Sequence, residues 1–278
     1  MNRQYTEEEL WQLHGVLYEI LAEVIRVCDK LDIEYFAIGG TGIGVHFHQG
    51  IIPWDDDIDI GMTRDNYNRF LKEAPAVLKP EYFLAWYGSD PHTPFYFAKL
   101  RKSNTTFLEE ACQDLDMHHG IYVDIFPLDK LPQNPRMEFV QRRLCCRLSE
   151  CLAGKEVWLW KYWGKCKISR PDAKGFWGCL ATRLAVTFLP KSLIYRMLCW
   201  LQSMFNDSNG KEYNIILTSV DQIPVEDVHN LQWGKLGPLN VKVPNHLEKY
   251  LKHHYKGLTK DVPKEKRENH APVKLLFQ

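Results

Sequence analysis

The chain has 278 residues, 45% of them hydrophobic, which is enough to form a substantial core in one large domain or two smaller ones. Its 35 lysines and arginines balance its 35 aspartates and glutamates, and without a basic excess a nucleic-acid partner is not expected. The eight cysteines show no zinc-type spacing, the chain begins without a signal peptide, and no apolar stretch could span a bilayer, so we expect reduced thiols and a cytoplasmic location.

The first 80 residues alternate between helical and strand-like patterns. Thr6 and Glu9 form a capping box, and apolar residues then recur at spacings of three and four, which predicts a long amphipathic helix. Pro53 separates the next two strands, and Thr63 is expected to cap the helix that follows. The predicted elements are a helix over residues 6–31, a strand over 34–38, a brief helix ending near 48, a strand over 57–61 and a helix over 63–78.

Beyond residue 80 the pattern changes to aromatic strands and then to a long helical stretch. The predicted strands cover residues 82–87, 95–100, 105–108 and 121–126, and the last of them is expected to stop at Pro127. Helices are predicted within residues 136–205, followed by a strand at 213–217, a turn-rich segment at 233–243 and a helix at 246–255. Together these elements predict an α+β fold, with a mixed sheet, flanking helices and a helical insertion.

A run of acidic residues is the most informative stretch of the chain. Four aspartates occur within five positions, namely Asp55, Asp56, Asp57 and Asp59. Such carboxylates repel one another, so a folded chain holds them together only if a cation lies between them. On a strand Asp57 and Asp59 face the same way, while the isoleucines that alternate with them face a core. The pattern predicts a metal-binding site formed by Asp57 and Asp59. Asp55 either adds an outer contact to the metal or lies at the start of the strand without binding it.

A glycine turn upstream and a lone aspartate downstream complete the pattern. Gly39, Gly40 and Thr41 lead into a helix, and backbone N–H groups at such a turn can approach phosphates without a Cβ in the way. Asp124 stands alone on a later strand, where it could complete the metal shell or take a proton from an attacking hydroxyl. The order of these parts predicts nucleotidyl or phosphoryl transfer on a polymerase-β-like core with bound Mg²⁺ or Mn²⁺.

The acidic run has three other interpretations. Asp55, Asp57 and Asp59 match the first ligands of an EF-hand loop, but Ile60 occupies the glycine position and Asn66 the position of the bidentate glutamate. A solvated acidic surface is disfavoured because isoleucines alternate with the aspartates. Sugar-nucleotide glycosyltransferases also use an Asp-x-Asp motif, but the glycine turn upstream favours the polymerase-like core.

The same residues resemble the LicD family of phosphotransferases, whose distant relatives are fukutin and fukutin-related protein. The similarity lies in residues 40–50, in the block at 52–62 that contains Pro-Trp-Asp-Asp-Asp-Ile-Asp, and in residues 99–105, 123–129, 255–257 and 263–267. Carried over by position, Asp57, Asp59 and Asp124 are expected to be the metal-binding and catalytic carboxylates. The chain departs from the family at Phe47 and Gln49, where members often carry an arginine and a lysine.

The resemblance implies transfer of a phospho-alcohol, typically phosphocholine from CDP-choline, to a hydroxyl of a cell-surface glycan or glycolipid precursor. Lipopolysaccharide, teichoic acid and capsule are such glycans, and some relatives use CDP-ribitol. A soft boundary at residues 132–135 is expected to end a nucleotidyltransferase-like catalytic core over residues 1–132. A helical acceptor-side region over 133–210 and a mixed C-terminal segment over 211–278 that packs on the core are expected to follow. Two other classes stay open: a nucleotidyl (adenylyl) transferase on the same core, and a non-catalytic scaffold for glycan assembly.

Several further residues have two interpretations each. Lys99 and Arg101 alternate on one face of a strand, where they could bind donor phosphates or form an ordinary surface ladder. His119 precedes the Asp124 strand and is a candidate acceptor-site group, although paired loop histidines are more often structural. Trp158, Trp160 and Trp163 alternate with lysines, which suits helix packing but also a peripheral contact with the inner face of a membrane.

Overall fold

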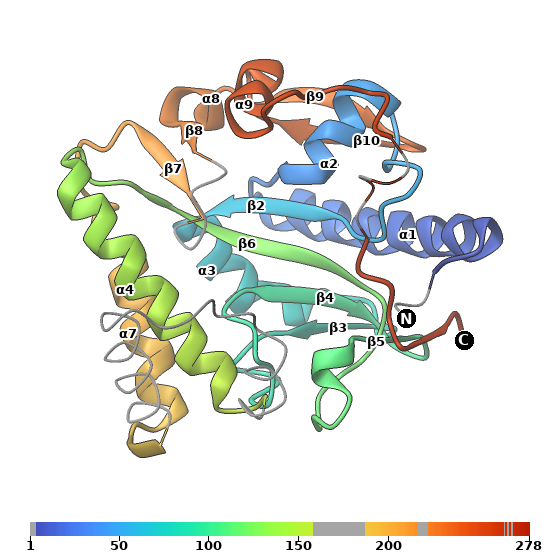
Figure 1. Ribbon diagram of the computed structural model, residues 1–278, viewed down its shortest axis with the longest axis horizontal. Helices are drawn as coiled ribbons and strands as arrows, with labels where there is room; N and C mark the ends of the chain where they lie inside the picture. Colours follow the sequence, from blue (N-terminus) through green and yellow to red (C-terminus); the bar gives the residue numbers. More distant parts are fainter. Residues whose placement is uncertain (1–3, 158–186, 216–221, 264, 266, 268) are drawn as a thin grey trace.

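The computed structural model describes residues 4–157, 187–215, 222–263, 265, 267 and 269–278. Its centre is a mixed sheet with helices packed around it, which confirms the predicted α+β class (Figure 1). Strands follow the order β1-β2-β6-β4-β3, and β7 and β8 extend the sheet beyond the end of β6. The strands are β1 (Phe36–Ala37), β2 (Asp59–Thr63), β3 (Tyr82–Ala85), β4 (Ala98–Lys102), β6 (Tyr122–Lys130), β7 (Glu212–Asn214) and β8 (Ile223–Pro224). Strands β2 and β6 run parallel, whereas the other neighbours are antiparallel.

Two small antiparallel ladders stand beside this sheet. One joins β5 (Thr106–Leu108) to β11 (Lys274–Leu276), so the end of the chain returns to the core. The other is a hairpin of β9 (Gln232–Leu236) and β10 (Leu239–Val243). The prediction of a turn-rich segment at 233–243 is therefore wrong. Gly237, with a φ of +61°, and the proline after it form a two-residue connection between paired strands.

Helices cover the sheet and extend from it (Figure 1). They are α1 (Glu7–Leu31), α2 (Gly39–Ile43), α3 (Arg64–Glu73), α4 (Pro135–Gly154), α7 (Lys191–Ser203), α8 (Val225–His229) and α9 (Leu247–His254), with a π-helix η1 (Gly44–His48) and 3₁₀ turns η2 (Ala74–Ala76) and η3 (Glu110–Cys112). The predicted capping box of α1 is confirmed, because Glu9 N donates to Thr6 Oγ1 and Thr6 N donates to the Glu9 carboxylate. Among the described residues, no helix is long and apolar enough to cross a membrane.

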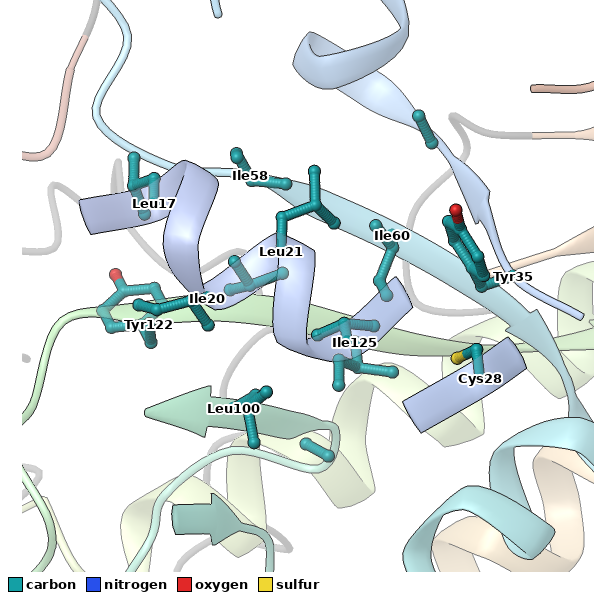
Figure 2. Close-up of a cluster of buried hydrophobic side chains, with 14 of the residues drawn as sticks. Leu17, Ile20, Leu21, Cys28, Tyr35, Ile58, Ile60, Leu100, Tyr122 and Ile125 are labelled. Carbon is teal, nitrogen blue, oxygen red and sulfur yellow. The ribbon is translucent and has the colours of Figure 1, made fainter. Parts of the chain in front are cut away.

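The main core lies between α1 and the sheet. Figure 2 shows Leu17, Ile20 and Leu21 of α1 packed over Ile60 of β2 and Ile125 of β6, and all five side chains are at most 1% exposed. This face of β2 is therefore apolar, as the alternation of aspartate and isoleucine predicts. Since successive residues of a strand point to opposite faces, the same packing turns the neighbouring aspartates away from α1.

Strand β6 is longer than predicted. It does not stop at Pro127 but continues to Lys130. A proline lacks the N–H that a ladder needs, and it is tolerated in a strand where that N–H would have no partner. Pro127 lies opposite Met62 of β2, and on its other side the pairing with β4 ends at Ile125 while the pairing with β7 begins at Asp129. The proline thus falls in the gap between these two ladders.

Other boundaries also differ from the sequence. Thr63 does occupy the N-cap position of α3, but its hydroxyl accepts from the Asn66 side chain rather than from a helical N–H. Strand β2 begins at Asp59, so Asp57 precedes the strand instead of starting it. Helices α4 and α7 confirm two parts of the predicted helical region and pack together through a separate apolar cluster. Trp158, Trp160 and Trp163 lie outside the described residues.

Candidate active site

The predicted carboxylates come from two neighbouring parallel strands. Asp59 is the first residue of β2, and it pairs in register with Asp124 of β6. The side chains of paired residues in a sheet lie on the same face, so these two carboxylates are close neighbours. The Asp59 N–H donates to the hydroxyl of Thr41 at 2.8 Å, which ties the start of β2 to the glycine turn.

The glycine turn lies directly against these acids. A Cβ on Gly40 would come 3.0 Å from Asp55 Oδ2, and one on Gly39 would come 3.5 Å from Asp59 Oδ2. Gly39 has a φ of +54°, which favours glycine, and its N–H donates to the Tyr250 hydroxyl at 3.0 Å. The missing side chains leave room beside the carboxylates at the start of α2.

Alternation separates the four aspartates into two groups. Asp55, Asp57 and Asp59 are half-buried, whereas Asp56 is 2% exposed. The Asp56 carboxylate is held by both ends of the chain: the Tyr5 hydroxyl donates to Oδ2 at 2.7 Å, and the His270 N–H donates to Oδ2 at 2.9 Å and to Oδ1 at 3.1 Å. Asp56 therefore anchors the acidic loop, a role that sequence reasoning missed.

Burial and mutual repulsion perturb the acids. Burial raises the pKa of Asp55 to about 8 and the pKa of Asp59 well above its usual range, and the neighbouring carboxylates add to both shifts. The pKa of Asp57 is raised for the same reasons. Burial also raises the pKa of Asp124, but the charge and hydrogen bond of Lys99 oppose it and leave the value at about 6. A bound cation would relieve this repulsion.

Lys99 and Arg101 lie on one face of β4, and neither forms a surface ladder. Lys99 is 3% exposed, with Nζ 2.9 Å from Asp124 Oδ1 and 3.4 Å from the ring centre of Tyr122. Arg101 is 0% exposed, and its Nη1 donates to the Gly120 carbonyl at 2.9 Å. Its guanidinium carbon lies 4.8 Å from the ring centre of the same tyrosine, Tyr122. Lys99 is thus a partner of Asp124, whereas Arg101 lies inside the protein.

His119 lies in the loop before β6. Its Nε2 lies 3.0 Å from the Leu115 carbonyl, and its own carbonyl accepts from the Phe107 N–H at 2.7 Å. These contacts tie it to the neighbouring loop and to β5. His118 beside it stacks on Phe83, with ring centres 5.0 Å apart.

One group of three potential metal ligands stands out in the part of the chain that the structure describes. Ligand atoms of Asp56, Asp57 and His270 all lie within 4.8 Å of one another. His270 was not predicted, because it comes from the C-terminal segment, far from the acidic run in sequence. This group fits a divalent metal, and Asp57 is the one residue that it shares with the predicted metal ligands.

Comparison with known proteins identifies relatives of this site. Residues 32–141 match the family model described as the LicD/FKTN/FKRP nucleotidyltransferase domain, and this range includes the glycine turn, Asp55–Asp59 and Asp124. The chain is 32% identical over 155 residues to the lipopolysaccharide cholinephosphotransferase LicD of Haemophilus influenzae. The matching region covers 52% of this chain and 54% of that protein.

Two further relatives are uncharacterized proteins of Rickettsia. The chain is 37% identical over 118 residues to one from Rickettsia typhi and 40% identical over 123 residues to one from Rickettsia prowazekii. The first match covers 36% of the relative and the second 41%, and each covers 42% of this chain. The chain therefore spans about half, or less, of the length of the curated relatives that it matches.

Proposed function

We propose that this chain, whose residues 32–141 match the LicD/FKTN/FKRP nucleotidyltransferase domain, is a metal-dependent phosphotransferase of the LicD family. It would transfer a phospho-alcohol, first of all phosphocholine, from a CDP-alcohol to a hydroxyl of a glycan or glycolipid such as lipopolysaccharide. The name of the Haemophilus relative supports choline and lipopolysaccharide. The observation that carries the proposal is the pairing of Asp59 with Asp124 beside the glycine turn.

The donor set fits a hard divalent cation, Mg²⁺ or Mn²⁺. Asp55, Asp57, Asp59 and Asp124 would hold it, because they offer oxygen atoms, and because burial, together with mutual repulsion, raises their pKa values. The space beside Gly39 and Gly40, which a Cβ would narrow, supports a phosphate group beside the cation. When bound, the metal would neutralise the charge of the donor phosphates.

The chemistry is a displacement at phosphorus. The acceptor hydroxyl oxygen forms a bond to the phosphorus that carries the alcohol, the bond from that phosphorus to the bridging oxygen breaks, and CMP leaves with the electron pair. Asp124 accepts the hydroxyl proton, since a pKa of about 6 keeps it ionised at neutral pH. Lys99, 2.9 Å from Asp124, orients that carboxylate and keeps its pKa from rising further.

The proposal gives a role to each of the three predicted parts of the chain. The core over residues 1–132 would carry the chemistry, the helical region over 133–210 would face the acceptor, and residues 211–278 would close the donor side. A cytoplasmic enzyme that works at the inner face of the membrane is consistent with a lipid-linked acceptor.

The test is transfer by purified protein with Mg²⁺ and CDP-choline, CDP-ribitol, CDP-glycerol or CDP-ethanolamine, using lipopolysaccharide oligosaccharide as acceptor. Mass spectrometry should find one phospho-alcohol on the acceptor and CMP in solution. A nucleotide on the acceptor would instead establish a nucleotidyltransferase. A scaffold would give no product and no change in melting temperature with Mg²⁺ plus CDP.

A further inference from the structure

The C-terminal segment crosses the edge of the sheet at which the candidate site lies. Figure 1 shows residues after α9, in red, passing the start of β2 and continuing to β5. Two attachments fix this path. The His270 N–H donates to both oxygens of the buried Asp56 carboxylate, and β11 pairs with β5 from Lys274 to Leu276. The segment between α9 and β11 is therefore held against the acidic loop.

Within this segment Arg267 lies on Trp54. Its guanidinium carbon is 4.2 Å from the ring centre, and its Nε donates to the Val262 carbonyl at 3.0 Å. The ring of His48 meets Trp54 edge-on at 6.0 Å. Trp54 immediately precedes Asp55, so the stack places an exposed arginine at the rim of the carboxylate cluster. A guanidinium stacked on an indole keeps its outer N–H groups available to an incoming anion.

The charge of the site explains why such a cation is needed. A nucleoside diphosphate is an anion, and it must approach a cluster of carboxylates. Lys99 is buried and paired with Asp124, and Phe47 and Gln49, at the end of η1 before the acidic loop, carry no charge. The C-terminal segment brings the cation Arg267 to the same rim. Burial lowers the pKa of His48 beside it, and of the two neighbouring charges in this segment Lys260 lowers it further while Asp261 opposes the shift.

We propose that Arg267, held on Trp54, binds a phosphate of the donor, and that Asp56 is a positioning residue that anchors the segment carrying it. A planar guanidinium can bind two phosphate oxygens at once, a geometry that lysine does not reproduce. The identity of the ligand as a CDP-alcohol rests on the proposed function. The assignment of Arg267 as an anion-binding residue rests only on the contacts above.

Isothermal titration of the full chain with Mg²⁺ present tests this assignment. Binding of CDP-choline and of inorganic pyrophosphate is compared in wild type, Arg267→Gln, Arg267→Lys and Lys274→Gln, the last as a matched loss of an exposed cation in β11, directly after this segment. Arg267→Gln should raise the dissociation constants of both ligands about tenfold or more, as expected for the loss of one charge-assisted contact. Arg267→Lys should recover only part of the loss, and Lys274→Gln should bind like wild type. In turnover assays Arg267→Gln should raise KM more than it lowers kcat.

The outcomes separate this inference from the proposed function. Equal binding by wild type and Arg267→Gln, or a lower melting temperature without a change in either dissociation constant, overturns the role of Arg267 and leaves the transferase proposal intact. If wild type binds pyrophosphate but not CDP-choline, and Arg267→Gln loses the former, the role of Arg267 holds and the cytidine donor is refuted. If wild type binds neither ligand, both proposals fail.

Discussion

Asp59 and Asp124 lie opposite each other in the register of the parallel strands β2 and β6. Ile60 and Ile125, which follow them, face α1 (Figure 2), so the alternation of a strand turns both carboxylates away from that apolar face. The relationship joins two segments that are far apart in sequence, and it depends on alternation within both strands. A shift of one residue in either strand would turn one carboxylate into the core. The site is therefore a consequence of the same packing that forms the core.

Replacing Asp59 with Asn should abolish transfer while the fold persists. Loss of one metal-binding charge should lower kcat about a hundredfold or more, by analogy with other charge-stabilising groups. The variant should melt at the same or a higher temperature than metal-free wild type, because one of several repelling carboxylates is gone. The exposed Asp65→Asn on α3 serves as the control. Full activity in Asp59→Asn would show that Asp59 is not a metal-binding residue.

Metal-free protein should lose stability as the pH rises through the neutral range. The folded-state pKa of Asp55 is about 8 and that of Asp124 about 6, both above the value near 4 of an unfolded aspartate. Their contribution to stability is complete below about pH 4 and is lost as the pH rises through the folded values. Thermal melts of wild type and Asp55→Asn, each with EDTA, should diverge between pH 5 and about pH 8, with the variant favoured at the higher pH. Parallel pH profiles would contradict the shift, and added Mg²⁺ should reduce the divergence.

Lys99 should set the acidic limb of the pH–rate profile. Its charge lowers the pKa of Asp124 against the effect of burial, so Lys99→Met should raise that pKa above about 6. If ionised Asp124 accepts the proton, the fall of kcat/KM at low pH should then begin at a higher pH. Lys102→Met is a matched control, since Lys102 lies on the same strand but pairs with Glu19 at the surface. An unchanged acidic limb in Lys99→Met would assign the proton to another group.

Replacing Asp56 should lower the stability of the folded protein, whereas replacing Asp57 should not. Its buried carboxylate accepts from Tyr5 and from the His270 N–H, so Asp56→Ala leaves these donors without their acceptor and should cost about 1–3 kcal/mol of unfolding free energy. Asp57→Ala removes a repelled charge and should leave that free energy unchanged or raise it. Denaturant unfolding measures both variants. Equal effects would mean that Asp56 is not an anchor.

The sequence predicts the site as far as local patterns reach. Alternation of aspartate with isoleucine identifies the half-buried acids, and the glycine turn indicates the proposed phosphate side, because both patterns depend on residues close together in the chain. The anchors of Asp56 could not be predicted, since Tyr5 is 51 residues away and His270 is 214 residues away. The burial of Arg101 likewise depends on a tertiary contact with Gly120.

In the fold as well, features that depend on local patterns could be predicted and features that depend on long-range contacts could not. The long amphipathic helix α1 was predictable from its period, whereas the β9–β10 hairpin was not, because its glycines and proline resemble a loop until the strand pairing is known. Pro127 similarly ends a strand on local rules, and only the position of its neighbours shows that the missing N–H costs no hydrogen bond.

The glycine turn provides a last test, in which stability and activity should separate. Gly40→Ala places a Cβ 3.0 Å from Asp55 Oδ2 at an unstrained backbone position, so it should narrow the metal-side space and raise the KM for donor with little change in melting temperature. Gly39→Ala must adopt a φ of +54° and should cost about 1–2 kcal/mol of stability as well. Gly15→Ala, on the exposed face of α1 with nothing within 4 Å of the added carbon, is the control and should stabilise the protein by up to about 1 kcal/mol. Unaltered donor kinetics in Gly40→Ala would show that the phosphates bind elsewhere.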